Sequence, residues 1–253
     1  MKKYSGVYQP LIARLTQEGA NNSKAVKTKL HQVYGAYTQE NGYKKATKIL
    51  DELIKEERIP GHVHSDIHEV SKMLLGLHTS TKERLPFYDE FYGFILENTG
   101  PIKSVLDIGC GYNPFSVPLI QIKLEAYFAV DIDVRVANLI NHFFVILGLP
   151  PYAKCADLAV EIPKESADIA LVCKLLPVLE AQSSGSGFSL LRQLNTKYLL
   201  ITYPLKSLGG REKGMAKNYS ATFEKAVNEG QLAPFTLINQ KQVGHEMLYL
   251  ASK

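Results

Sequence analysis

The sequence has few cysteines, no long apolar run and no strong excess of charge of either sign. Its three cysteines, Cys110, Cys155 and Cys173, are an odd number without metal-ligand spacing, which argues against a disulfide framework and against a zinc knuckle. The longest nearly apolar stretch, residues 169–179, contains Lys174 and is shorter than the ~18 to 20 residues that a membrane helix needs. The first residues run into mixed polar sequence, so no secretory signal is expected. We therefore expect a soluble cytoplasmic protein with free thiols and no membrane association.

The length and composition fit one full-sized folded domain, or one domain with an added N-terminal piece. The chain has 253 residues, of which 45% are hydrophobic and 21% are charged. These proportions are ordinary for a globular protein and exclude an intrinsically disordered chain.

Positive charge is in small overall excess but is unevenly distributed. The formal net charge is +4, whereas residues 1–60 contain 11 basic and 6 acidic side chains and residues 204–225 contain 5 basic and 2 acidic side chains. The rest of the chain is therefore net acidic. Concentrated positive charge neutralises phosphates and releases counterions, which favours a nucleic-acid partner. The alternative is two helical faces that are merely solvated.

The pattern of apolar residues changes near residue 100. Before it, apolar residues recur three and four apart between charged ones, which predicts helices. The last of these is expected to begin with Ser80 or Thr81 as its cap and Glu83 in its first turn. We interpret residues 1–100 as a helical N-terminal extension that is too polar to have an independent core. Its predicted helices cover residues 25–37, 43–57, 66–77 and 79–97.

Residues 101–253 alternate short apolar strands with helices, which predicts a parallel sheet covered on both faces. Helices are expected at residues 134–147 and 181–194, and the last two strands are typical of an antiparallel hairpin. The predicted fold class is α/β: a Rossmann-like, mostly parallel seven-stranded sheet with a C-terminal antiparallel hairpin and an N-terminal helical extension. The expected strands are residues 104–108, 126–130, 152–155, 168–173, 197–203, 235–240 and 246–251.

The first of these strands runs directly into a glycine-rich turn, Gly109-Cys110-Gly111. Glycine lets the backbone bend sharply and lets a ligand approach the main chain. The third glycine of a dinucleotide-binding fingerprint is missing, and Asp107 adds an acidic group inside the strand. This pattern is unlike a dinucleotide site and is similar to sites that bind S-adenosylmethionine, whose ammonium and sulfonium groups are positive.

Two further carboxylates follow the next two strands. Asp131 lies 22 residues after Gly109, a spacing at which a carboxylate can accept both ribose hydroxyls. Asp157 follows the third strand, where an adenine amino group could be read. The alternative is that Asp131 and Asp157 only end strands or cap helices.

Four sequence blocks resemble the aminoglycoside-resistance 16S rRNA methyltransferases. They cover residues 78–85, 106–114, 174–180 and 207–215, and they occur in the order of that family. The resemblance extends over roughly residues 25–253, with a stretch at residues 51–67 that is longer than is typical. It implies a class I methyltransferase that transfers a methyl group from S-adenosylmethionine to N7 of guanine 1405 in the decoding-site helix of 16S rRNA. It also implies the assembled 30S subunit as substrate and resistance to 4,6-disubstituted deoxystreptamine drugs.

The resemblance also implies roles for individual residues. His78, Ser80 and Arg84 fall in the block that contacts the methionine end of the cofactor. Gly109 lines the turn, Asp131 holds the ribose, and Asp157 with Leu158 reads adenine. Gly111 and Asp107 are assigned to the cofactor site from the glycine-turn pattern itself. Lys174 and Arg211 match basic positions near the target nucleotide. S-adenosylhomocysteine is the product, and no metal is expected.

Guanine N7 already carries an in-plane lone pair and no proton at neutral pH, so its methylation requires alignment and no general base. Lys174 is expected to emerge at the carboxyl edge of the sheet, where it could hold a phosphate or a guanine oxygen; the alternative is a surface lysine. Arg211 lies in a basic loop that could close over a flipped base, or else in a solvated linker. Residues expected to bind RNA are Lys27, Lys29, Lys44, Lys45, Lys174, Lys206, Arg211 and Lys213.

Several residues, and the function itself, allow a second interpretation. Cys173 fits a buried strand thiol better than the thiolate nucleophile of a C5-pyrimidine enzyme. Tyr112 and Tyr203 could stack on a flipped base or could pack in the core. The same scaffold could act on another RNA base, a tRNA or a metabolite, or could serve as a non-catalytic ribosome-binding factor. We expect a monomer whose residues 1–100 dock on the 30S subunit and whose residues 101–253 carry out catalysis.

Overall fold

The computed structural model describes residue 4 and residues 6–19, 23–35, 40–57, 66–120, 122–205 and 215–253; the side chains of residues 35, 40, 56, 57 and 215–220 are outside this description. The chain forms two compact units. The first combines Met1–Leu85, Cys110–Gln121 and Ala129–Asp157, and the second combines Pro86–Gly109, Ile122–Phe128 and Leu158–Lys253. The division at residue 100 into a docking extension and a catalytic domain stays a prediction.

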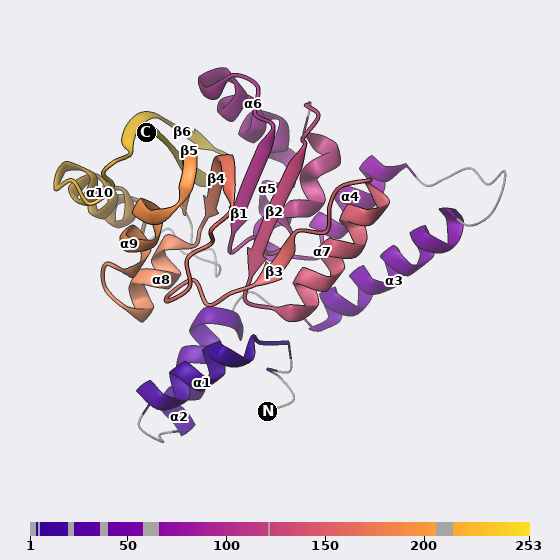
Figure 1. Ribbon diagram of the computed structural model, residues 1–253, viewed down its shortest axis with the longest axis horizontal. Helices are drawn as coiled ribbons and strands as arrows, with labels where there is room; N and C mark the ends of the chain where they lie inside the picture. The colour runs from indigo at the N-terminus through magenta and orange to yellow at the C-terminus, as the bar shows by residue number, and fades with distance from the viewer. Residues whose placement is uncertain are drawn as a thin grey trace. The chain divides into compact units, whose positions relative to one another are not determined.

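A seven-stranded sheet with the order β3-β2-β1-β4-β5-β7-β6 runs through the molecule (Figure 1). Parallel pairs join β2 to β3, β1 to β4 and β4 to β5, whereas β7 is antiparallel to both β5 and β6. The predicted fold class is confirmed, including the C-terminal hairpin. The strands are β1 Ser104–Ile108, β2 Ala126–Asp131, β3 Ala153–Cys155, β4 Ser166–Cys173, β5 Asn195–Pro204, β6 Thr236–Val243 and β7 Glu246–Ser252.

The chain order reverses between β1 and β4, which are parallel neighbours in the centre of the sheet. Such a reversal leaves a crevice at the carboxyl ends of the strands, where open α/β sheets bind their ligands. The glycine turn directly follows β1, and Lys174 directly follows β4. The topology therefore places both features at the carboxyl edge, as the sequence predicts.

Several helices in the second half of the chain differ from the prediction. The expected helix 134–147 is confirmed as α7 Val134–Ile146, but residues 181–194 do not form one helix. Two short helices, α8 Leu176–Gln182 and α9 Ser186–Gln193, are separated by a turn in which Gly185 has a φ of +80°. A left-handed residue cannot continue a right-handed helix, so the chain is interrupted there. The prediction missed α10, Met215–Asn228, and a 3-10 segment, η4 Asn113–Leu119, after the glycine turn.

The N-terminal part is helical as predicted, with corrected bounds. The predicted helix 79–97 is wrong as a single element because Pro86 cannot donate a backbone hydrogen bond and breaks it. The first piece begins at Thr79 with His78 at the cap position, so neither Ser80 nor Thr81 caps it. The elements are α1 Gln9–Glu18 (which was not predicted), α2 Ser23–Leu30, the π-helical turn η2 His31–Gly35, α3 Glu40–Glu57, α4 Ile67–Leu75, α5 Thr79–Arg84, the 3-10 turn η3 Leu85–Phe87 and α6 Tyr88–Thr99.

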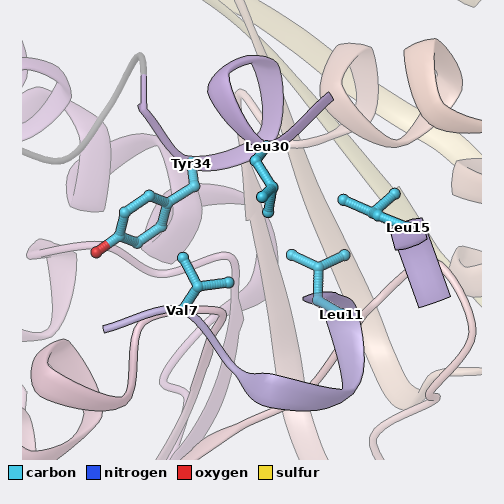
Figure 2. Close-up of a cluster of buried hydrophobic side chains, with 5 residues drawn as sticks. All are labelled: Val7, Leu11, Leu15, Leu30 and Tyr34. Carbon is cyan, nitrogen blue, oxygen red and sulfur yellow. The ribbon is translucent and has the colours of Figure 1, made fainter. Parts of the chain in front are cut away.

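The first helices are held by a small apolar cluster within the first unit (Figure 2). Its fully buried members come from the segment before α1, from α1, and from α2 with its π-helical turn. Ile132, which follows β2, packs against the cluster and is partly buried. The buried part of the cluster therefore comes from the N-terminal segment itself, and Ile132 connects it to the end of β2. The expectation that the extension has no independent core stays a prediction. The cluster consists of Val7, Leu11, Leu15, Leu30 and Tyr34.

Cys110, Cys155 and Cys173 form no disulfide. Within the described ranges, no helix combines the length and the apolar character that spanning a bilayer requires.

Candidate functional site

The turn after β1 adopts a backbone conformation that glycine favours. Gly109 has a φ of +65° and Gly111 a φ of +51°. A Cβ atom at Gly109 would lie 2.8 Å from Cδ1 of Leu175, and one at Gly111 would lie 3.2 Å from Cε1 of His78. Both the left-handed backbone and the close neighbours therefore disfavour larger residues in this turn.

Asp131, the last residue of β2, contacts this turn directly. Its Oδ2 accepts a hydrogen bond from the Gly111 N–H at 2.8 Å, and its Oδ1 accepts one from the Asp133 N–H at 2.9 Å. Burial raises the pKa of the Asp131 carboxyl, while these backbone hydrogen bonds oppose the rise. Each oxygen has a second lone pair, so the carboxylate can still accept from ligand hydroxyls.

Helix α5 lies against the same turn in the first unit. The His78 ring stacks on Tyr112, with ring centroids 5.3 Å apart and planes at 27°. Arg84 is buried, and its Nη1 donates to Oδ1 of Asn113 at 3.0 Å. Ser80 lies on the same helix and is half-buried. The structure thus brings together two of the sequence blocks that carry the resemblance, and it packs Tyr112 in the interior.

Asp157, the predicted adenine reader, is 3% exposed and is paired with Arg14 of α1. Arg14 Nε donates to Oδ2 at 2.7 Å and Nη2 donates to Oδ1 at 3.1 Å. Arg14 Nη1 donates to Glu18, whose other oxygen accepts from Lys29 at 3.0 Å. Hydrogen bonds from Lys29 and Arg14 hold the pKa of the Glu18 carboxyl below its usual value. Sequence reasoning missed Arg14 because it stands 143 residues from Asp157 and belongs to no motif.

A second buried polar network surrounds Asp133, which caps α7 by accepting from the Arg135 N–H at 2.9 Å. The Tyr34 hydroxyl donates to Oδ2 of Asp133 at 2.8 Å, and Arg135 Nη2 donates to the same oxygen at 3.0 Å. The Val134 N–H donates to the Gly6 carbonyl at 2.9 Å. These hydrogen bonds hold the N-terminal segment to Asp133 and Val134, which directly follow the candidate ribose-binding residue Asp131 and Ile132 in the chain. No motif or spacing in the sequence indicates this network.

In the second unit, Asp107 is fully buried within β1 and accepts a hydrogen bond from the Tyr127 hydroxyl at 2.7 Å. Leu158 is also buried. The placement of Asp107 inside the strand agrees with the sequence, and its contact with a cofactor stays a prediction.

Lys174 follows β4 with a φ of +56°, the one positive value found for a non-glycine residue in the described part of the chain. Its backbone N–H donates to the Thr202 carbonyl at 3.0 Å, and its ammonium lies 3.4 Å from Oε1 of Glu246, which is 3% exposed. The Thr202 hydroxyl donates to the other Glu246 oxygen at 2.7 Å. Strained residues of this kind gather at functional sites. Glu246 was not predicted, although a carboxylate that opens an apolar strand is a visible signal.

The remaining predicted residues are placed as follows. Tyr203 is buried and packs against Phe223 and Tyr249, which corresponds to the packing alternative. Cys173 is half-buried at the end of β4. At a different cysteine, Cys155, burial raises the pKa of the thiol to about 12. Of the predicted RNA-binding lysines, Lys27, Lys44 and Lys45 are exposed on α2 and α3, and Lys29 pairs with Glu18. Lys206, Arg211 and Lys213 lie outside the described residues.

The side chains that commonly bind metal ions do not cluster in this structure as far as it is described. No group of three or more His, Cys, Asp or Glu side chains gathers as metal ligands in the portion of the chain that is described. The prediction that the protein needs no metal stays a prediction.

Comparisons with known proteins agree with this geometry. Residues 2–248 match the family described as Ribosomal RNA methyltransferase (FmrO). A 16S rRNA (guanine(1405)-N(7))-methyltransferase of Serratia marcescens is 35% identical, covering 100% of this chain and 94% of that protein, and one of Proteus mirabilis is 32% identical, covering 99% and 93%. The crystal structure of the 16S rRNA methyltransferase RmtF in complex with S-adenosyl-L-homocysteine superposes with a TM-score of 0.83 at 32% identity, covering 100% of this chain and 94% of that one.

Proposed function

The chain belongs to the FmrO family of ribosomal RNA methyltransferases, and on this premise we propose that it transfers a methyl group from S-adenosylmethionine to N7 of guanine 1405 in 16S rRNA. The observation that carries the proposal is similarity over the full length of the chain to proteins named 16S rRNA (guanine(1405)-N(7))-methyltransferase. The hydrogen bond from Gly111 of the glycine turn to Asp131 supports it. The expected substrate is the 30S subunit, and the expected consequence is resistance to 4,6-disubstituted deoxystreptamine aminoglycosides.

The residues present fit this cofactor by their chemistry. Asp131 has acceptor capacity for two ribose hydroxyls and is fixed by the Gly111 and Asp133 N–H groups. Asp157 is buried and oriented, as an acceptor for an adenine amino group must be. His78, Ser80 and Arg84 would hold the methionine end, with Arg84 itself fixed by Asn113. When bound, S-adenosylmethionine supplies an activated methyl group.

The contribution of the chain to the reaction is positioning. Guanine N7 has no proton to remove at neutral pH, so no side chain has to act as a base. Alignment of reacting groups can account for about 7 to 11 kcal/mol of a barrier. Lys174 would serve as a fixed positive charge for the target nucleotide, because Glu246 and the Thr202 backbone restrict its position. Arg211 would contact the flipped nucleotide from its loop.

Docking on the ribosome is assigned to the basic N-terminal helices. Lys27, Lys44 and Lys45 are exposed and available for phosphates, and Lys29 would exchange its contact with Glu18 for one with RNA. Weak exposed ion pairs of this kind are readily exchanged. The N-terminal segment is meanwhile held in place by the network around Asp133.

The test uses purified protein, labelled S-adenosylmethionine and isolated 30S subunits. Primer extension after borohydride and aniline cleavage should show a stop at guanine 1405 in treated 16S rRNA that the untreated sample lacks. Asp131→Ala should lose binding of S-adenosylhomocysteine and methylation together. Labelling of a small molecule or of another RNA base, with guanine 1405 unmodified, would overturn the proposal.

A further inference from the structure

The contact between Arg14 and Asp157 joins α1 to the residue assigned to adenine recognition, and both belong to the first unit. We propose that Arg14 is a positioning residue for the cofactor: it orients the Asp157 carboxylate and makes α1 a structural part of the adenine subsite. This inference rests on the proposed function, because it takes S-adenosylmethionine as the ligand that Asp157 meets.

The geometry of the pair supports orientation. Arg14 uses Nε and Nη2 on the two separate oxygens of Asp157, at 2.7 and 3.1 Å. A two-pronged contact of this type fixes the plane of a carboxylate, which a single hydrogen bond does not. Each carboxylate oxygen carries two lone pairs, and the contact with Arg14 uses one of them. The carboxylate can therefore remain paired and still accept a hydrogen bond from a ligand amino group.

Burial explains why Asp157 depends on this partner. Asp157 is 3% exposed, and the Arg14 side chain is 18% exposed. A buried carboxylate that loses a two-pronged cationic partner must rotate or take up a proton, and either change removes an oriented acceptor. Truncation of Arg14 would therefore weaken cofactor binding indirectly, because the Asp157 carboxylate would no longer be held in place.

Arg14 is itself held from two sides. Leu11 and Leu15 of the same helix are fully buried in the apolar cluster of Figure 2, so packing determines the position of α1. Glu18 binds the remaining Nη1 of Arg14 at 2.7 Å and is bound in turn by Lys29. The helix thus presents a preorganised guanidinium to Asp157, and cofactor binding should in return stabilise the docked helix, since such coupling is reciprocal.

Isothermal titration with S-adenosylhomocysteine on the full chain tests the proposal. Arg14→Ala should raise the Kd about tenfold, the change expected when a hydrogen bond to a charged group is lost. Arg14→Lys, which keeps the charge without the fork, should recover part of the affinity. Glu18→Gln is the matched control: its amide oxygen can still accept from Nη1 of Arg14, so Arg14 stays held and Asp157 stays paired while one charge is removed, and the Kd should stay within about twofold of wild type.

Two further measurements separate positioning from general destabilisation. On 30S subunits, Arg14→Ala should raise the KM for S-adenosylmethionine while kcat at saturating cofactor stays within about twofold. In the wild type, S-adenosylhomocysteine should slow amide hydrogen exchange in α1, a measurement that needs no variant.

The inference is overturned if Arg14→Ala binds S-adenosylhomocysteine as tightly as wild type, or if Glu18→Gln weakens binding equally. If Arg14→Ala does not fold, two other measurements test the inference. It is overturned if S-adenosylhomocysteine leaves amide exchange in α1 of the wild type unchanged and Arg14→Lys binds the ligand with the wild-type Kd. Failure of the proposed function looks different, because the wild type would then bind S-adenosylhomocysteine without methylating guanine 1405.

Discussion

Tyr34→Phe removes one hydroxyl from the buried network that anchors the N-terminal segment. That hydroxyl donates to Oδ2 of Asp133 at 2.8 Å, and both residues are no more than 3% exposed. A buried hydrogen bond to a charged group contributes about 1.5 to 3 kcal/mol. We therefore expect a loss of about 2 kcal/mol in unfolding free energy, which corresponds to a fall in Tm of about 4 to 8 °C for a chain of this size.

Thermal unfolding followed by circular dichroism measures this change, and a double-mutant cycle isolates it. Asp133→Asn keeps an oxygen that can cap α7, so the cycle with Tyr34→Phe reports the hydroxyl–carboxylate pair. The matched control is Tyr43→Phe, because the Tyr43 ring lies 4.9 Å from the guanidinium carbon of Arg135 and Phe retains that contact. Coupling below about 0.5 kcal/mol, or an equal effect of Tyr43→Phe, would refute the reasoning.

The same pair predicts a dependence on alkaline pH. Burial, with the neighbouring Asp133 carboxylate, raises the pKa of the Tyr34 hydroxyl. A group whose pKa rises on folding contributes stability that is complete below its unfolded pKa, near 10, and is lost as the pH increases toward the folded value. The wild type should therefore lose stability above about pH 10 more steeply than Tyr34→Phe.

Other perturbations test separate parts of the molecule. Asp168 accepts hydrogen bonds from the Lys103 and Ser104 N–H groups at 2.7 and 2.9 Å, and these lower its carboxyl pKa although burial opposes them. Asp168→Ala should cost about 1 to 2 kcal/mol in urea unfolding at pH 7, and the difference from wild type should shrink as the pH falls below about 4. The raised pKa of Cys155 should slow its alkylation at pH 8 at least about a hundredfold relative to an unperturbed thiol, measured by peptide mass spectrometry; rapid labelling would contradict this. Arg211→Ala should leave S-adenosylhomocysteine binding unchanged and lower methylation of 30S subunits about tenfold; unchanged turnover would remove its assigned role. Alanine at four lysines should weaken 30S binding and reduce the salt slope by about 1 for each lost phosphate contact, whereas equal binding at low salt would count against docking. These lysines are Lys27, Lys29, Lys44 and Lys45.

Local patterns predicted the strands well because each strand is a short apolar run between turn residues. The bounds of β1 agree at both ends, and those of β2 differ by one residue. Interrupted helices were harder to predict from the sequence. The helical spacing of apolar residues continues across Pro86, so the prediction merged α5 with α6. The two are separate helices because proline has no backbone N–H to donate.

The candidate site was predictable where it depends on chain geometry. A glycine turn after one parallel strand and a carboxylate ending the next must meet at one edge of the sheet, and Gly111 does donate to Asp131. Tyr112 and Tyr203 could not be assigned from sequence, since an aromatic side chain that stacks on a base and one that packs in the core look the same there. Burial decided for packing in both cases.

The amino-acid sequence by itself determined the α/β class, the strand set and the meeting of the glycine turn with Asp131, because these follow from local hydrophobic periodicity and from the fixed geometry of parallel strands. Only the tertiary structure decided which charged and polar groups are paired. Arg14 reaches Asp157 across 143 residues, Tyr34 reaches Asp133 across 99, and Glu246 meets Lys174 from another strand. An ion pair depends on the separation and burial of its two side chains in space, and those quantities exist only once distant segments have packed together.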